Sequence, residues 1–89
     1  MVADHKKVTR LLKTARGQLD GLLKMVEDDR YCIDISTQIS ATQAILKKAN
    51  EEILTGHLHG CVREAFESGD EREKDQKIEE IITILRKIS

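Results

Sequence analysis

An uninterrupted helical pattern from about Ile33 to Glu67 constrains the fold of this chain more than any other feature. Apolar or small residues recur along it at three- and four-residue steps, which gives a helix one buried stripe. The stripe consists of Ile35, Ile39, Thr42, Leu46, Ala49, Ile53, Cys61, Ala65 and Phe66. The chain contains no proline, so no residue in this stretch lacks a backbone hydrogen-bond donor. We therefore predict one long helix over residues 33–67.

Two shorter helical patterns flank the long one. The first covers residues 8–26; Asp4 is placed to cap its start, and acidic residues 27–29 end it. Gly69 predicts a break after the long helix, and a charged run over 71–77 leads into a short third helix over 78–88. With one Tyr, one Phe and no Trp, the chain lacks bulk for a globular centre. These features predict an all-α, three-helix protomer in a single domain, residues 1–89, that packs into a bundle.

Four glycines lie within the predicted helices. Gly17 and Gly21 each cost about 1 kcal/mol against alanine, so we expect another helix or a DNA backbone to approach closely there. Gly56 and Gly60 flank a histidine in the long helix and predict a loosening or bend at that point.

The net charge of −1 conceals an asymmetry along the chain. Residues 1–24 hold six basic and two acidic side chains (+4), and the rest holds nine basic and fourteen acidic (−5). A basic first helix suits a phosphate-contacting surface, although a solvated helix face is the commoner meaning of exposed charge. The chain has no long apolar run and no signal-peptide pattern, so we expect a cytoplasmic protein with no membrane partner.

The two cysteines and one histidine share a helix face. His57 and Cys61 are four residues apart and stack like two ligands of one ion. Cys32 lies 25 residues before His57, on the same face but roughly 37 Å away along a continuous helix. That distance excludes a disulfide within the chain. One chain cannot close a three-ligand site, but two antiparallel chains can, so the spacing predicts both a metal and a dimer.

Two thiolates and one imidazole form a soft ligand set. A zinc site normally needs a fourth ligand and iron–sulfur clusters usually need four cysteines, so a three-coordinate site suits Cu(I) best. His59 lies on the opposite side of the helix and is expected to be exposed, whereas His5 could join the site if the N-terminal tail folds over it. From spacing alone, these residues are more often buried than ligating. No oxyanion donor or substrate cleft accompanies the Cys–His pair, which argues against an enzyme with a small-molecule substrate.

Three motifs resemble those of the CsoR/RcnR family of bacterial metal-sensing repressors. They are the segment from Asp29 to Ala41 (DRYCIDISTQISA), the pair Gly17-Gln18, and the segment from His57 to Val62 (HLHGCV). The resemblance covers roughly residues 5–88 and keeps the order and spacing of the motifs.

The resemblance to the copper-sensing branch has several implications. It implies an antiparallel four-helix-bundle dimer that pairs into a tetramer, and a Cu(I) site of Cys32 from one protomer with His57 and Cys61 of its partner. Tyr31 and Glu80, or Glu79 in place of Glu80, are implied to support those ligands. The implied function is repression of copper-resistance genes by the apo form, with release of operator DNA on Cu(I) binding. The DNA contacts implied are Arg10, Lys13, Arg16 and Gln18, with Lys47 and Lys48 as weaker candidates.

Three other functions remain open on the sequence. A persulfide-responsive repressor on the same scaffold would use both cysteines, but that branch typically lacks the ligand corresponding to His57. A nickel or cobalt sensor would add histidines where this chain has Cys61. A copper carrier without a DNA role is opposed by the basic first helix. Arg16 and Asp20 depart from the pattern of many relatives, which weakens the assignment of individual DNA contacts.

Overall fold

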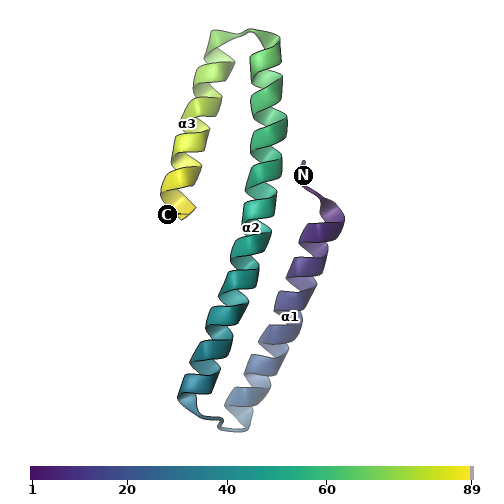
Figure 1. Cartoon of the computed structure of the whole chain (residues 1–89), viewed down its shortest axis with the longest axis vertical. Helices are drawn as coiled ribbons and strands as arrows, with labels where there is room; N and C mark the ends of the chain where they lie inside the picture. Colours follow the sequence, from purple (N-terminus) through teal and green to yellow (C-terminus); the bar gives the residue numbers. More distant parts are fainter. Residues whose placement is uncertain (89) are drawn as a thin grey trace. The chain divides into compact units, whose positions relative to one another are not determined.

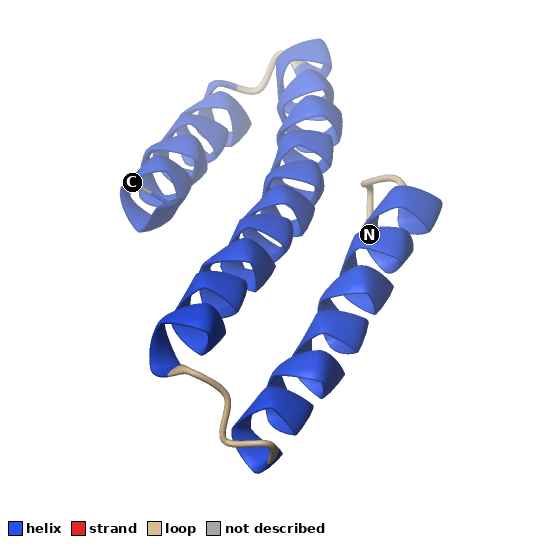
Figure 2. Ribbon diagram, turned by 60° about the horizontal axis from the view of Figure 1, so that its bottom comes forward, coloured by secondary structure: helices blue, strands red, loops and turns tan. Residues whose placement is uncertain are grey.

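The computed structural model describes residues 1–88, which form three α-helices joined by short connections (Figure 1). α1 spans His5–Glu27, α2 spans Cys32–Ser68 and α3 spans Glu71–Ile88. The described residues contain no strand (Figure 2). The prediction of an all-α, three-helix protomer is confirmed, and α2 is one continuous helix, as the unbroken pattern indicated.

Polar side chains and two left-handed residues set the helix ends. Asp4 caps α1, because its carboxylate accepts a hydrogen bond from the backbone N–H of Lys7 at 3.2 Å. Asp29 (φ 52°) lies in the connection from α1 to α2, and Gly69 (φ 72°) follows the end of α2. Asp70 accepts from the N–H of Arg72 at 2.9 Å.

The cap at Asp70 corrects one prediction. The sequence predicts that the charged run over residues 71–77 precedes the third helix, but α3 begins at Glu71 and includes the whole run. Acidic side chains at Glu71 and Glu73 fall in the first turn, where they complement the helix dipole, and Arg86 and Lys87 fall in the last turn. Charge at both ends therefore favours the longer helix.

The chain divides into two compact units, and one comprises residues 4–52. In it, α1 packs against the first part of α2 through a seam with a seven-residue repeat. Val8, Ala15 and Leu22 are buried on α1, and Thr42 and Ala49 are buried on α2. A seven-residue repeat of small and apolar residues is the pattern of coiled-coil packing. An ion pair also joins the two helices, Lys7 Nζ to Glu52 at 2.8 Å.

The other unit comprises residues 1–3 and the chain from Ile53 onward. Here α3 packs on the last part of α2, where Ala65 is buried. Residues 1–3 lie against α2: Cβ atoms added at Gly56 and Gly60 would lie 2.7 Å from Ala3 Cα and 2.8 Å from Val2 Cγ1. These two glycines therefore leave room for the N-terminal segment, and α2 continues through both.

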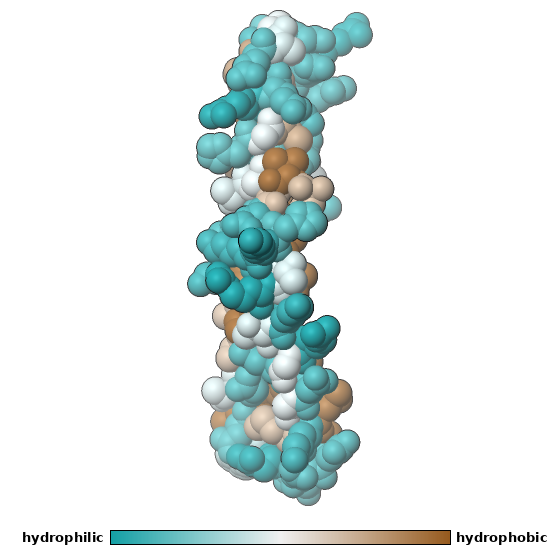
Figure 3. Space-filling model, turned by 90° about the vertical axis from the view of Figure 1, so that its right-hand side faces the viewer, coloured by the Kyte–Doolittle hydropathy of each residue, from teal (hydrophilic) through white to brown (hydrophobic). Residues whose placement is uncertain are grey.

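Much apolar surface stays exposed in residues 4–52. No large side chain is fully buried among the described residues, and hydrophobic patches reach the surface between hydrophilic ones (Figure 3). An apolar groove of about 530 Å³ runs along this unit. It is lined by Leu19, Leu22, Leu23, Val26, Ile35, Ile39, Thr42, Gln43 and Leu46. The groove is a continuous apolar surface on these residues, and the predicted packing into a bundle with a second chain stays a prediction.

Among the described helices, none combines the length and the apolar character that a membrane crossing requires.

Candidate metal centre and basic helix face

α2 carries all three predicted metal ligands. His57 and Cys61 come together: Nδ1 of His57 lies 3.6 Å from Sγ of Cys61. Cys32 is the first residue of the same helix, 25 residues earlier and exposed. At about 1.5 Å per residue the helix separates it from His57 by roughly 37 Å. Within residues 1–88 no group of three or more His, Cys, Asp or Glu side chains lies close enough together to hold an ion.

A carboxylate from α3 orients the His57 ring. Oε1 of Glu80 contacts Nε2 of His57, and Oε2 of Glu80 accepts from Lys77 Nζ at 3.3 Å. Because Nε2 is engaged with the carboxylate, Nδ1 is the ring nitrogen directed at Cys61. The hydrogen bond from His57, with a smaller contribution from Lys77, holds the pKa of the Glu80 carboxyl below its usual range, although partial burial opposes this.

The structure separates the two glutamates that the resemblance offered. Glu79 is exposed, and its backbone carbonyl accepts from the Thr83 hydroxyl at 2.9 Å. Glu80 faces α2 and contacts His57. A metal-binding imidazole commonly has such a carboxylate partner on its other nitrogen. Of the two carboxylates, Glu80 is the one in contact with the imidazole.

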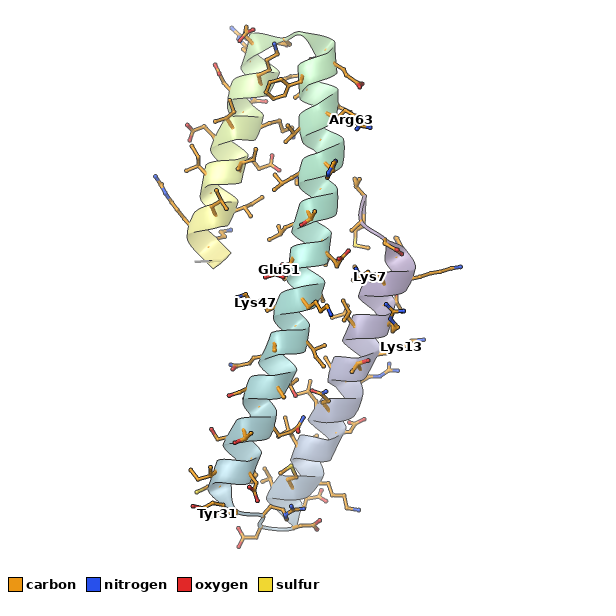
Figure 4. All side chains as sticks on the ribbon, in the orientation of Figure 1. Lys7, Lys13, Tyr31, Lys47, Glu51 and Arg63 are labelled. Atoms are coloured by element: carbon orange, nitrogen blue, oxygen red, sulfur yellow. The ribbon has the colours of Figure 1, made fainter. Side chains whose placement is uncertain are left out.

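The remaining histidines and Tyr31 lie elsewhere. His59 is exposed, as its position in the helix predicted. His5 is the first residue of α1 and is also exposed. Tyr31 precedes Cys32 at the start of α2, where its backbone carbonyl accepts from the N–H groups of Asp34 and Ile35 and its side chain is exposed (Figure 4).

His57 lies in the wall of a groove with a volume of about 730 Å³. The groove is also lined by Ile53, Leu54, Glu80, Thr83, Ile84 and Lys87. Met1 and Val2 also line it, so the N-terminal segment forms one wall beside the imidazole. Sequence reasoning missed this wall. The sequence feature that points to this wall is the pair Gly56 and Gly60, because two missing side chains leave room for another segment as well as for a bend.

The exposed side of α1 forms a basic face. A shallow groove of about 580 Å³ on this face is lined by His5, Lys6, Thr9, Arg10, Lys13 and Thr14. Arg16 is also exposed on α1. Lys13 projects from α1 away from α2, whereas Lys47 projects from the side of α2 away from α1 (Figure 4). The structure thus groups Arg10 and Lys13 and separates Lys47 from them.

Gln18 differs from the other predicted DNA contacts. It is half-buried, and its amide oxygen accepts a hydrogen bond from the hydroxyl of Thr42 at 2.7 Å. Gly17, its neighbour, has no atom within 4 Å of an added Cβ, and the same holds for Gly21. The close approach predicted at these two glycines is therefore not made by other parts of the described chain.

Comparisons with known proteins add a family and several relatives. Residues 4–87 match the profile of the family described as metal-sensitive transcriptional repressor. The copper-sensing transcriptional repressor CsoR of Bacillus subtilis (strain 168) is 42% identical over 86 residues, 97% of this chain and 82% of that protein. The repressor of the same name from Mycobacterium ulcerans (strain Agy99) is 48% identical over 58 residues, 65% of this chain and half of that longer protein.

A solved structure is also similar. The crystal structure of the copper-sensing repressor CsoR with Cu(I) from Geobacillus thermodenitrificans NG80-2 matches with a TM-score of 0.80 and 38% sequence identity. The match covers 92% of this chain and 82% of that one.

Proposed function

Because the chain belongs to the metal-sensitive transcriptional repressor family, we propose that it is a Cu(I)-responsive transcriptional repressor. Its apo form binds operator DNA, and Cu(I) binding releases the DNA and derepresses copper-resistance genes. Relatives and a similar solved structure named as copper-sensing support this choice of metal. Because a repressor works on chromosomal DNA, the proposal places the protein in the cytoplasm and gives it no catalytic role.

The observation that carries the proposal is the oriented pair of His57 and Cys61. The imidazole nitrogen that faces Cys61 is Nδ1, and Glu80 holds the opposite nitrogen. With Cys32 the donor set has two thiols and one imidazole, and such soft donors suit Cu(I) better than hard cations. Ionised thiols are the ligating form, so binding releases protons from the cysteines.

Cys32 of a second protomer completes the site in this proposal. Two antiparallel α2 helices bring Cys32 of one chain to His57 and Cys61 of the other when they cross near Ile45 and Leu46. The exposed apolar groove of residues 4–52 supplies surface for such a four-helix bundle. Pairing of two dimers gives a tetramer. Tyr31, directly before Cys32, then reaches the partner's imidazole region.

The exposed face of α1 is the proposed DNA surface. Arg10, Lys13 and Arg16 carry charge into solvent from one helix, and contacts of that kind go mainly to phosphates. Cys32 of one subunit and His57 and Cys61 of the other would hold Cu(I), so occupancy would link two subunits. Glu80 contacts the imidazole from α3, which places α3 next to the proposed site. The resulting negative coupling is reciprocal: DNA lowers Cu(I) affinity by the factor by which Cu(I) lowers DNA affinity.

The test is a fluorescence-anisotropy titration of the apo-protein against a duplex from upstream of its own gene, with and without one equivalent of Cu(I) per protomer. We expect apo-protein binding that weakens steeply with salt and falls at least fivefold on Cu(I) addition. Equal affinity with and without Cu(I) would refute the proposal.

A persulfide-responsive repressor is not favoured. Sulfide chemistry at Cys32 and Cys61 has no need for an imidazole held by a carboxylate, yet His57 and Glu80 are in contact. Nickel and cobalt favour more nitrogen and oxygen donors than this site offers.

A further inference from the structure

A part-buried hydrogen bond between α1 and α2 suggests how the basic face is oriented. The Thr42 hydroxyl lies 2.7 Å from Oε1 of Gln18 and 3.1 Å from the backbone carbonyl of Gln38. A threonine hydroxyl has one hydrogen to donate, and the shorter distance assigns it to Gln18. Thr42 is only 3% exposed. A polar group at such a site is stable because it is hydrogen-bonded.

The rest of this helix seam is apolar. Its most buried residues, Ala15 and Ala49, are each 2% exposed and carry only methyl side chains, and the larger Val8 and Leu22 of α1 are 4% and 7% exposed. Methyl groups let two helices approach closely, but they interdigitate less than large side chains do. A single directional polar contact in an apolar seam fixes helix register in coiled coils. The Thr42–Gln18 bond has the geometry for that role here.

The second polar link between the helices is weaker. The side chains of Lys7 and Glu52 are 40% and 32% exposed, and ion pairs this exposed contribute little to stability. It also lies near the first turn of α1, whereas Gln18 lies in the second half of the helix. The less exposed Thr42–Gln18 hydrogen bond is therefore the stronger of these two polar constraints on the rotation of α1.

Rotation of α1 matters because its charges occupy one side. Successive residues of an α-helix are about 100° apart around the axis, so a small turn redirects every side chain. With Gln18 bonded to α2, Arg10 and Lys13 are exposed and share the basic groove. If Gln18 leaves Thr42, the exposed Lys7–Glu52 ion pair and apolar contacts are left to hold those cations on that side.

We propose that Thr42 is a positioning residue for DNA binding: its hydrogen bond to Gln18 fixes the rotation of α1 and hence the direction of the basic face. The inference rests on the proposed DNA-binding function. It also revises the role of Gln18, which acts from within the helix pair and does not contact DNA directly.

The test compares Thr42→Val, Thr42→Ser, Gln18→Met and the double variant Thr42→Val with Gln18→Met. Thr37→Val is the matched control, because the exposed Thr37 hydroxyl bonds only to the Ile33 carbonyl of its own helix, at 2.8 Å. Each full-length protein is titrated against the upstream duplex at several salt concentrations. Circular dichroism checks folding, and chelator competition measures Cu(I) affinity.

We expect Thr42→Val and Gln18→Met each to lose about three- to tenfold in DNA affinity, the scale of one hydrogen bond. The double variant loses no more than either single one, because both remove the same bond. Thr42→Ser keeps the hydroxyl and retains wild-type affinity, as does Thr37→Val. Cu(I) affinity stays at the wild-type value in all variants.

Three results would overturn the inference. One is wild-type DNA affinity in Thr42→Val; another is additive losses in the double variant, which would make Gln18 a direct contact. The third is loss in Thr42→Ser equal to that in Thr42→Val, which would mean that packing and not the bond matters. If Thr42→Val does not fold, the DNA affinities of Gln18→Met and Thr42→Ser decide: wild-type affinity in Gln18→Met, or a loss in Thr42→Ser equal to that in Gln18→Met, would overturn the inference. A wild-type protein that shows no salt-dependent DNA binding would instead refute the proposed function itself.

Discussion

Replacing Glu80 by glutamine should change the affinity for Cu(I) more than it changes the free energy of unfolding of the apo-protein. The substitution keeps the size of the side chain and removes the charge that contacts His57. The side chains of His57 and Glu80 are 39% and 34% exposed, so solvent screens the pair. Pairs exposed to this degree contribute about 0–1 kcal/mol to stability. We therefore expect a change of less than about 1 kcal/mol in the free energy of unfolding of the apo-protein.

The effect on Cu(I) binding should be larger. Glu80 holds Nε2, so Nδ1 is directed at Cys61 without a search over ring orientations. Glutamine can still accept from Nε2–H but lacks the carboxylate charge, and mutation of a partner behind a metal ligand typically lowers metal affinity about 10- to 100-fold. That corresponds to about 1.4–2.7 kcal/mol, more than the whole expected stability change. Competition with a chromophoric Cu(I) chelator measures the affinity, and thermal unfolding measures the stability.

Glu79→Gln is the matched control, because the same chemical change then falls on the exposed neighbouring side chain. We expect wild-type Cu(I) affinity in that variant. Equal affinities for Glu79→Gln and Glu80→Gln would contradict the reasoning, as would a Glu80→Gln protein whose loss of stability accounts for its whole loss of affinity.

Three further predictions follow from the geometry. Gly56→Ala places a Cβ 2.7 Å from Ala3 Cα, so residues 2–3 should be displaced from α2 and their NMR chemical shifts should change, although helix propensity improves; Gly21→Ala, which meets nothing within 4 Å, should leave those shifts unchanged. Lys13→Gln should lower DNA affinity and reduce the magnitude of its log–log salt slope by about one, measured by anisotropy; an unchanged slope would remove Lys13 from the phosphate contacts. Since the folded-state pKa of Glu80 lies below its ordinary value of 4.5, its contribution to apo-protein stability is present above pH 4.5 and lost as the pH falls through the folded pKa. The difference in free energy of unfolding between wild type and Glu80→Gln, measured by urea unfolding, should therefore shrink as the pH falls below 4.5. A difference that stays constant with pH would contradict this prediction.

Local rules made much of the fold predictable. The three-four spacing of apolar residues and the absence of proline were enough to predict α2, because both act within a few residues of each position. The proximity of His57 and Cys61 followed from their four-residue spacing, since helix geometry alone brings such pairs together. The start of α3 is not evident from the sequence, because a dense run of charge after a glycine is compatible with a loop as well as with a helix. In the structure Asp70 caps this helix and so fixes its start.

Features that depend on tertiary approach were not predictable from spacing. Gly56 and Gly60 signalled a missing side chain, but the sequence does not say whether a bend or a neighbouring segment uses the space; Ala3 and Val2 use it. The family resemblance places Gln18 among the DNA contacts. Its hydrogen bond to Thr42 depends on the packing of α1 on α2, which residue spacing within one helix does not reveal.

Mixing two defective variants tests most directly whether the metal site is shared between chains. Cys32→Ala removes one ligand, and the double variant His57→Ala with Cys61→Ala removes the other two. Each variant alone should lose high-affinity Cu(I) binding. After unfolding and refolding together, each mixed dimer should regain one such site, built from Cys32 of one chain and His57 and Cys61 of the other. A mixture that binds no more Cu(I) than its separate components, or a Cys32→Ala protein with wild-type affinity, would contradict the account.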